Sequence, residues 1–126
     1  MQPATNAPLG DVATRLLFEN DAVKVWEMTL APGEASDLHR HDHPYVMCVL
    51  EGSRIDAEIV GKGRLQIPVQ PGSVLFVPPG ETEIARNGTD RPFREILIEL
   101  KAVAKDVAPE VAVANMPGPP VVLPSD

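Results

Sequence analysis

The sequence predicts an all-β protein, on three observations. Fourteen prolines and nine glycines divide its 126 residues into short segments. Within these segments apolar residues recur at every second position, as in strands with one buried face. The turns recur about every eight to twelve residues, a spacing typical of sandwiches and barrels. We therefore expect one all-β domain, because a chain of this length suffices for one core.

The predicted strands follow these turns in order. The first clear alternation covers Val23 to Leu30 and stops at the turn Ala31-Pro32-Gly33. Proline cannot donate a hydrogen bond within a sheet, so Pro68 requires an edge or the end of a strand. Residues Asp11 to Glu19 fit either a short helix or an additional strand. The remaining predicted strands are Tyr45–Leu50, Ile55–Val60, Arg64–Val69, Ser73–Val77, Thr82–Arg86 and Phe93–Lys101.

The composition changes after Lys101, where alanine, valine and proline predominate. We therefore predict an N-terminal extension over residues 1–11, a β-domain over 12–101 and an extended C-terminal arm over 102–126. Three placements of the arm remain open. It lies along the barrel, lies along a partner subunit, or forms a flexible end.

The charge and hydropathy of the chain argue against two classes of partner. The formal charge is −7, whereas nucleic-acid binding needs a basic surface and anionic membranes repel acidic proteins. No apolar run reaches the length of a membrane span, and residues 1–10 lack the pattern of a secretory signal. The single cysteine, Cys48, lies in an apolar strand and is expected to act as a small hydrophobe. We expect a cytoplasmic protein with a small-molecule ligand.

The three histidines, His39, His41 and His43, all lie within five residues. Alternate residues of a strand share a face, so their side chains are expected on one side, followed by Tyr45. Imidazoles that converge in this way hold a divalent transition metal in many proteins. The alternative is a polar strand end with solvated or hydrogen-bonded histidines.

Two motifs in the chain have the spacing of a known family. In the first, Gly33 is followed by five residues, His39-Arg40-His41, then Tyr45 and Gly52. In the second, Gly72 is followed by five residues, Pro78-Pro79-Gly80, then Glu83 and Asn87. With these spacings the chain resembles the cupin family over residues 23–101. The resemblance implies a jelly-roll β-barrel and, since small cupins commonly pair, a homodimer.

The resemblance also suggests where a metal is held. Cupins that bind a metal use two His and a Glu of the first motif and a His of the second. This chain keeps His39 and His41 but has Tyr45 at the Glu position and Glu83 at the second His position. One interpretation is a rearranged site, in which His39, His41 and Glu83 hold Fe, Mn, Ni or Zn. The other is a cup that has lost its metal.

The leading functional hypothesis is a metal-dependent enzyme, dioxygenase-like, acting on a small polar organic molecule. Tyr45 or His43 would move a proton. Arg94 is a further candidate, which meets a substrate carboxylate if its face of the last strand is the interior. The alternative for Arg94 is a surface ion pair with Glu95 or Glu99. The alternatives for the protein are an isomerase or lyase using the same metal, and a non-catalytic binding or sensor protein.

Overall fold

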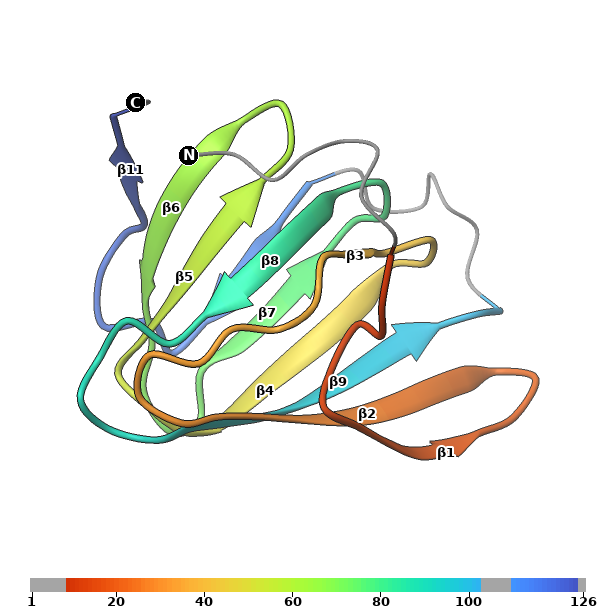
Figure 1. Ribbon diagram of the computed structural model, residues 1–126. Coiled ribbons are helices and arrows are strands. Elements are labelled where there is room, and N and C mark those ends of the chain that lie inside the picture. Colours follow the sequence, from red (N-terminus) through yellow and green to blue (C-terminus); the bar gives the residue numbers. More distant parts are fainter. Residues whose placement is uncertain (1–8, 103–109, 125–126) are drawn as a thin grey trace.

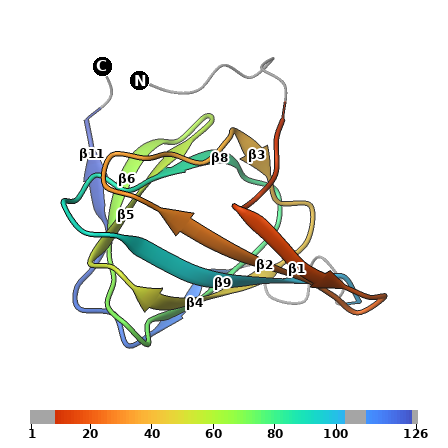
Figure 2. The same cartoon turned by 60° about the horizontal axis from the view of Figure 1, so that its bottom comes forward.

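Two antiparallel β-sheets face each other in the computed structural model (Figures 1 and 2), which describes residues 9–102 and 110–124. The larger sheet has the strand order β1-β2-β9-β4-β7-β10, and the smaller has the order β11-β6-β5-β8-β3. The described residues contain no helix, so none of them forms an apolar helix that could cross a membrane. The all-β jelly-roll expectation is confirmed.

The observed strands follow the predicted ones closely, and Thr82–Arg86 agrees at both ends. Residues 15–19 form a strand, which settles the choice between helix and strand left open for the segment from Asp11 to Glu19. Pro68 is the last residue of its strand, as its missing N–H requires. The strands are β1 Arg15–Glu19, β2 Val23–Leu30, β3 His39–Arg40, β4 Tyr45–Glu51, β5 Arg54–Ile59, β6 Gly63–Pro68, β7 Val74–Val77, β8 Thr82–Arg86, β9 Phe93–Leu100, β10 Ala112–Ala114 and β11 Val121–Leu123.

The two motifs serve the corners of the barrel. Gly52 has a φ of 128°, and a Cβ at this position would lie 2.6 Å from Cδ1 of the buried Phe93, so only glycine fits. Asn87 is fully buried, and its side-chain amide donates to the carbonyls of Leu30 and Arg91 at 2.9 and 2.7 Å. These contacts hold the connection between β8 and β9 against the end of β2.

The core lies between the sheets, at one end of the space that they enclose. Its centre contains Met28, Phe93 and Leu97, each at most 2% exposed. Burial of each such side chain contributes about 1.5–3 kcal/mol to stability. The core cluster continues through Trp26, Leu30, Tyr45, Val49, Ile55 and Val69. Ala85 of β8, a strand that carries the candidate site, packs against this cluster.

The described part of the C-terminal arm lies along the barrel. β10 pairs with β7 at one edge of the larger sheet, and β11 pairs with β6 at one edge of the smaller sheet. One segment therefore extends both sheets. Figure 1 shows β11 in dark blue beside β6. Residues 103–109 and 125–126 of the predicted arm, and residues 1–8 of the predicted extension, lie outside the described residues.

Homodimerisation stays a prediction. Leu16, Leu17 and Phe18 of the outermost strand β1 are 41–53% exposed, which is unusual for large apolar side chains.

Candidate metal centre

The pairing of β3 with β8 places the two candidate ligand strands side by side. His39 is the direct partner of Glu83 in this register. Beyond the end of β3, the His41 N–H donates to the carbonyl of Glu81 at 3.1 Å, and the Gly80 N–H donates to the carbonyl of His41 at 2.8 Å. These bonds continue the strand-like pairing past Arg40 to His41. His41 therefore points to the same side as His39.

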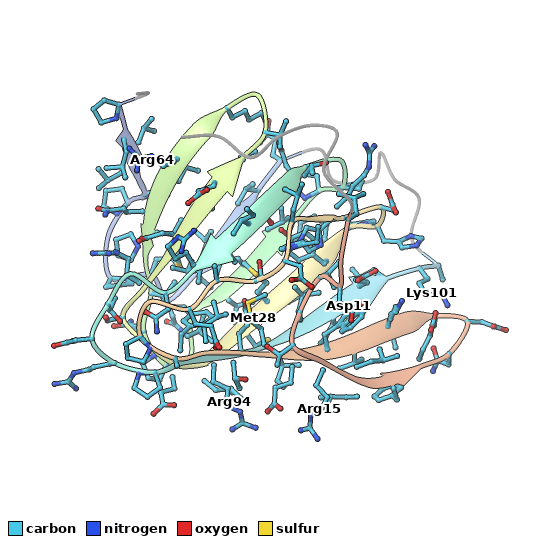
Figure 3. The ribbon with its side chains drawn as sticks, viewed as in Figure 1. Asp11, Arg15, Met28, Arg64, Arg94 and Lys101 are labelled. Carbon is cyan, nitrogen blue, oxygen red and sulfur yellow. The ribbon has the colours of Figure 1, made fainter. Side chains whose placement is uncertain are left out.

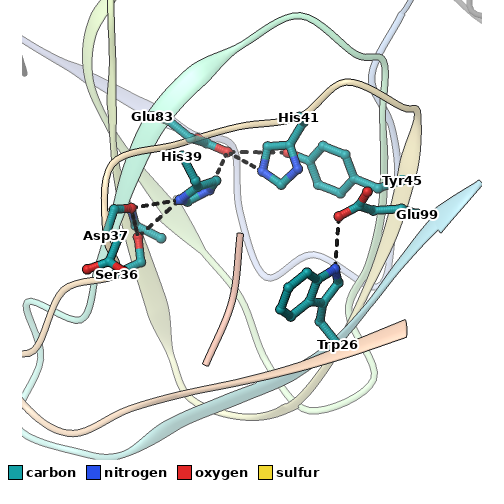
Figure 4. Close-up of polar contacts among 9 residues, drawn as sticks. Trp26, Ser36, Asp37, His39, His41, Tyr45, Glu83 and Glu99 are labelled. Carbon is teal, nitrogen blue, oxygen red and sulfur yellow. Dashed lines mark hydrogen bonds and ion pairs between the residues drawn. The ribbon is translucent and has the colours of Figure 1, made fainter. Parts of the chain in front are cut away.

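The side chains of His39, His41 and Glu83 converge inside the barrel (Figure 4). One ligand-type atom from each lies within 4.8 Å of the others. Nε2 of His39 lies 3.8 Å from Oε1 of Glu83, and Nε2 of His41 lies 3.2 Å from the same oxygen. Both histidines are only 1% exposed. The metal triad predicted from the sequence is therefore brought together.

The hydrogen bond of His39 identifies which of its nitrogens is available to a ligand. Nδ1 lies 2.8 Å from the carbonyl oxygen of Asp37, which can only accept, so Nδ1 carries a hydrogen and donates. In the neutral ring, Nε2 then has a lone pair directed toward the Glu83 carboxylate. Burial, followed by the neighbouring His41, lowers the pKa of His39, which disfavours a second proton on this ring. A cation between Nε2 and the carboxylate would relieve the repulsion of the two lone pairs.

Glu83 is the common partner of the cluster. Burial acts to raise its pKa, but the hydrogen bond and charge of His41, the charge of His39 and the Tyr45 hydroxyl outweigh burial and hold the pKa below its ordinary value. Glu83 is thus a carboxylate at neutral pH, the form that can ligate a metal.

Tyr45 supports the ligands rather than replacing the missing glutamate. Its hydroxyl donates to Oε1 of Glu83 at 3.3 Å, and its ring stacks on His41 with centroids 3.9 Å apart. Burial and the charge of Glu83 raise its pKa well above the ordinary value, so the phenol keeps its proton. Tyr45 therefore orients one ligand by a hydrogen bond and another by stacking.

The chemistry of this donor set fits a divalent transition metal. Two imidazoles and one carboxylate form the two-histidine, one-carboxylate set of non-haem iron sites, and the set also suits Mn, Ni or Zn. The buried Nδ1 of His41 has no partner among the described residues, so the protein groups alone leave the cluster incompletely satisfied. His39, His41 and Glu83 would hold the ion, and all three side chains line the cavity.

The site opens on a cavity of about 710 Å³, which is within the range of small-molecule pockets, about 300–1,000 Å³. Most of its lining is apolar, and Met28, Met47, Ile67 and Leu97 are typical. The ionisable side chains of its described lining are His39, His41, Tyr45, Lys62, Glu81, Glu83 and Glu95. Part of the wall comes from the C-terminal arm, through Val111, Val113, Met116, Pro119 and Pro120.

The prediction that His43 joins the other histidines is wrong. His43 lines a separate polar crevice of about 260 Å³, together with Lys24, Glu99 and Lys101. The physical reason is that β3 ends at Arg40, and the short link through the buried Pro44 does not keep the strand alternation. A ligand or proton-transfer role for His43 in the main cavity has no geometric support.

Arg94 also lies away from the site (Figure 3). Its guanidinium donates from Nε to Oε2 of Glu27 at 2.7 Å, on the outer face of the larger sheet. The interior face of β9 carries Phe93, Glu95, Leu97 and Glu99, the opposite parity to Arg94. Glu95 and Glu99 are therefore buried, and Glu27 is the ion-pair partner of Arg94.

Glu95 is the cavity residue that the sequence analysis missed. It is 2% exposed, lines the cavity, and its Oε2 atom has no hydrogen-bond partner among the described residues. Burial, followed by the charge of Glu83, raises its pKa from 4.5 to about 8. The sequence contained a signal for this position, because Glu95 is two residues from both Phe93 and Leu97 and therefore shares their face of the strand.

Comparisons with known proteins agree with the geometry. The family described as "Cupin domain" matches residues 26–99. A cupin domain protein from Bordetella pertussis Tohama I superposes with a TM-score of 0.66 at 27% identity, over 76% of this chain and 98% of the other. A putative glyoxylate-induced protein from Pseudomonas aeruginosa gives 0.58 at 27% identity, over 75% of this chain but only 36% of the other.

The salicylate 1,2-dioxygenase of Pseudaminobacter salicylatoxidans shares the fold alone. Its TM-score is 0.50 at 23% identity, and the match covers 62% of this chain and 22% of the dioxygenase. No curated protein matches the chain in sequence.

Proposed function

Because this chain belongs to the cupin domain family, we propose that it binds one divalent transition metal through His39, His41 and Glu83 and acts on a small organic molecule in the adjoining cavity, as a dioxygenase-like enzyme. The observation that carries the proposal is the convergence of three ligand-type side chains, within 4.8 Å, in the wall of a mostly apolar cavity. Both histidines are buried, and Glu83 is 14% exposed. Burying two imidazoles and a carboxylate without a partner ion is unfavourable.

The protein's own residues would bind the metal and hold the side chains of His39, His41 and Glu83 in fixed orientations. When bound, a metal of this kind acts as a Lewis acid that orients a substrate oxygen and activates a small reactant. The carbonyl of Asp37 fixes the ring of His39, and Tyr45 fixes His41 by stacking and Glu83 by its hydroxyl. The apolar wall keeps water from the remainder of the cavity, which strengthens these electrostatic contacts.

A second candidate function is a non-catalytic binding protein with the same cavity. The specific observation in its favour is the contact network from His41 and Tyr45 to Glu83, which partly satisfies the cluster without an ion. In this alternative the cavity binds a ligand, and the cluster only closes its polar end.

Metal analysis of the protein, purified without a histidine tag, tests the proposal. We expect about one equivalent of metal per chain, and a loss of metal in His41→Ala and Glu83→Ala. Glu58→Ala is the matched control, because Glu58 lies on the neighbouring strand β5 and its carboxylate pairs with Arg86 instead of the cluster. Failure of the wild type to retain or take up Fe, Mn, Ni or Zn would leave the binding-protein alternative.

A test of oxygen use separates the remaining enzyme classes. The metal-loaded protein is screened with small acids, diols and phenols while dissolved oxygen is recorded. Consumption of oxygen that depends on a substrate and on Glu83 supports the dioxygenase-like reaction. Turnover that continues without oxygen supports an isomerase or lyase.

A further inference from the structure

Outside the proposed metal centre, the described cavity lining has two further sets of ionisable side chains, of which the first is the ion pair of Lys62 with Glu81. The second is Glu95 on β9, whose direct strand partners are Met28 on β2 and Val49 on β4. Both partners are apolar, so neither can accept or donate a hydrogen bond to the carboxyl group. A buried carboxyl group in apolar surroundings is unfavourable unless something binds it.

The register of the larger sheet places Glu95 further along the strands than Tyr45, whose hydroxyl contacts Glu83 of the proposed metal centre. Tyr45 pairs with Glu99 and Val49 pairs with Glu95, so four residues along the strand separate the Tyr45 level from the Glu95 level. At ~3.3 Å per residue this corresponds to about 13 Å between Cα atoms. The side chains between the two levels are Met47 and Leu97, which are apolar and line the cavity.

On this geometry, and resting on the proposed metal function, we infer that Glu95 is a second anchor for the ligand, hydrogen-bonding an acceptor group at the far end of an elongated molecule. The head of that molecule lies at His39, His41 and Glu83, and its apolar body lies against Met47 and Leu97. The ligand class is therefore a molecule with two polar ends and an apolar middle, such as an oxo acid or a hydroxylated, carbonyl-bearing aromatic.

The chemical state of Glu95 favours an acceptor on the ligand. The titratable group that acts on Glu95 from across the cavity is Glu83, and the Glu95 charge in turn acts on Tyr45. With a pKa of about 8 the carboxyl is protonated at neutral pH and has an O–H to donate. The terminal torsion of a glutamate is broad, so either oxygen can turn toward the cavity.

The proposal is tested with a matched pair of chelating probes on zinc-loaded protein. One probe is a straight-chain alkyl hydroxamate, whose head binds the metal. The other has a ketone in place of one methylene near the far end, and the pair is prepared at several chain lengths. Calorimetry at pH about 6.5 gives the ratio of the two dissociation constants for each length.

We expect the ketone to bind roughly three- to tenfold more tightly at one chain length, the gain from one added hydrogen bond. Glu95→Gln keeps an N–H donor at the same place and should keep the preference. Glu95→Leu should lose it while its zinc content stays unchanged. As the pH rises and Glu95 ionises, the wild type should lose the preference, whereas Glu95→Gln should keep it.

Three outcomes separate the anchor from the metal. Equal affinities for ketone and alkyl probes at every length, or a preference that survives in Glu95→Leu, overturn the anchor alone. A ketone preference in chelator-treated protein that takes up no zinc supports the anchor and overturns the metal. Binding of neither probe by either form overturns both. Circular dichroism and urea unfolding of the two variants confirm that each retains the fold.

Discussion

Glu83 and Glu95 line the same cavity, yet their surroundings shift their pKa values in opposite directions. Glu83 has His39, His41 and Tyr45 around one oxygen, and its pKa is held below the ordinary value although burial opposes this. Glu95 has apolar strand neighbours and an unpartnered oxygen, and its pKa rises to about 8. Two carboxyl groups whose pKa values differ in this way are suited to different tasks. Glu83 is suited to binding a cation, and Glu95 is suited to donating a hydrogen bond.

The largest effect that tests this comparison is metal-dependent stabilisation. Adding Zn²⁺ at about a thousand times its dissociation constant should raise the free energy of unfolding by about 4.1 kcal/mol, because the folded state alone has the assembled site. Urea unfolding with and without zinc measures it. His39→Ala should abolish this increase and Glu95→Gln should keep it. An increase that persists in His39→Ala would place the metal elsewhere.

The second effect is a gain in stability in Glu95→Leu, by about 3 kcal/mol at pH 7. The unfolded carboxyl, with a pKa of 4.5, is ionised at this pH, while the folded one stays protonated. Keeping it protonated over these 2.5 pH units costs about 1.4 kcal/mol per unit. The folded-state pKa is raised, so the wild type loses stability as pH rises from about 4.5 to about 8.

Urea unfolding of Glu95→Leu and the wild type across this pH range measures the difference. The advantage of the variant should grow with pH and then level off above about 8. A difference that does not change with pH would show that Glu95 is ionised in the folded protein.

The third effect, intermediate in size, is a loss of metal affinity in Tyr45→Phe. This substitution removes the hydroxyl that donates to Glu83 but keeps the ring that stacks on His41. Loss of an outer partner of a metal ligand typically lowers affinity about 10- to 100-fold, and we expect a loss in that range. Competition with a chelating dye measures the metal affinity. An unchanged affinity would mean that stacking alone orients the site.

The smallest effect is expected outside the cavity, in Arg94→Ala. The ion pair of Arg94 with Glu27 lies on the outer face, and the arginine is half-exposed, so its removal should cost about 1 kcal/mol or less. Metal content and probe affinity should not change. A change in the affinity of a carboxylate ligand would revive the substrate role that the sequence suggested.

Much of this comparison follows from the sequence, but the interior face of the last strand does not. Turn residues and motif spacing predict the strands, and strand parity predicts that His39 and His41 share a side. The alternation of β9 is ambiguous because Ile96, Ile98 and Leu100 form an apolar set on one face, which the sequence alone suggests as the inward one. The structure places Glu95 and Glu99 inward instead. Glu95 lines the cavity, and Glu99 accepts a hydrogen bond from the indole N–H of Trp26.

The histidines show a second limit. Parity holds only while backbone pairing continues, and it continues through His41 but not to His43. A sequence motif does not show where the pairing stops. The carboxylate at Glu83 was predictable from the resemblance, because Glu83 stands at the position of the histidine in the second motif. The structure then pairs Glu83 directly with His39.

The C-terminal segment forms a part of the cavity wall that contains none of the proposed metal ligands. Residues 110–124 join β7 at one sheet edge and β6 at the other. Val111, Val113, Met116, Gly118, Pro119 and Pro120 of this segment line the cavity and supply none of the proposed ligands. Substitutions at Val111, Val113 or Met116 can therefore reshape the volume offered to a bound molecule while β3 and β8 keep their register. The proposed metal ligands and this part of the cavity wall therefore lie in separate stretches of the chain, so one can change in sequence while the other is preserved.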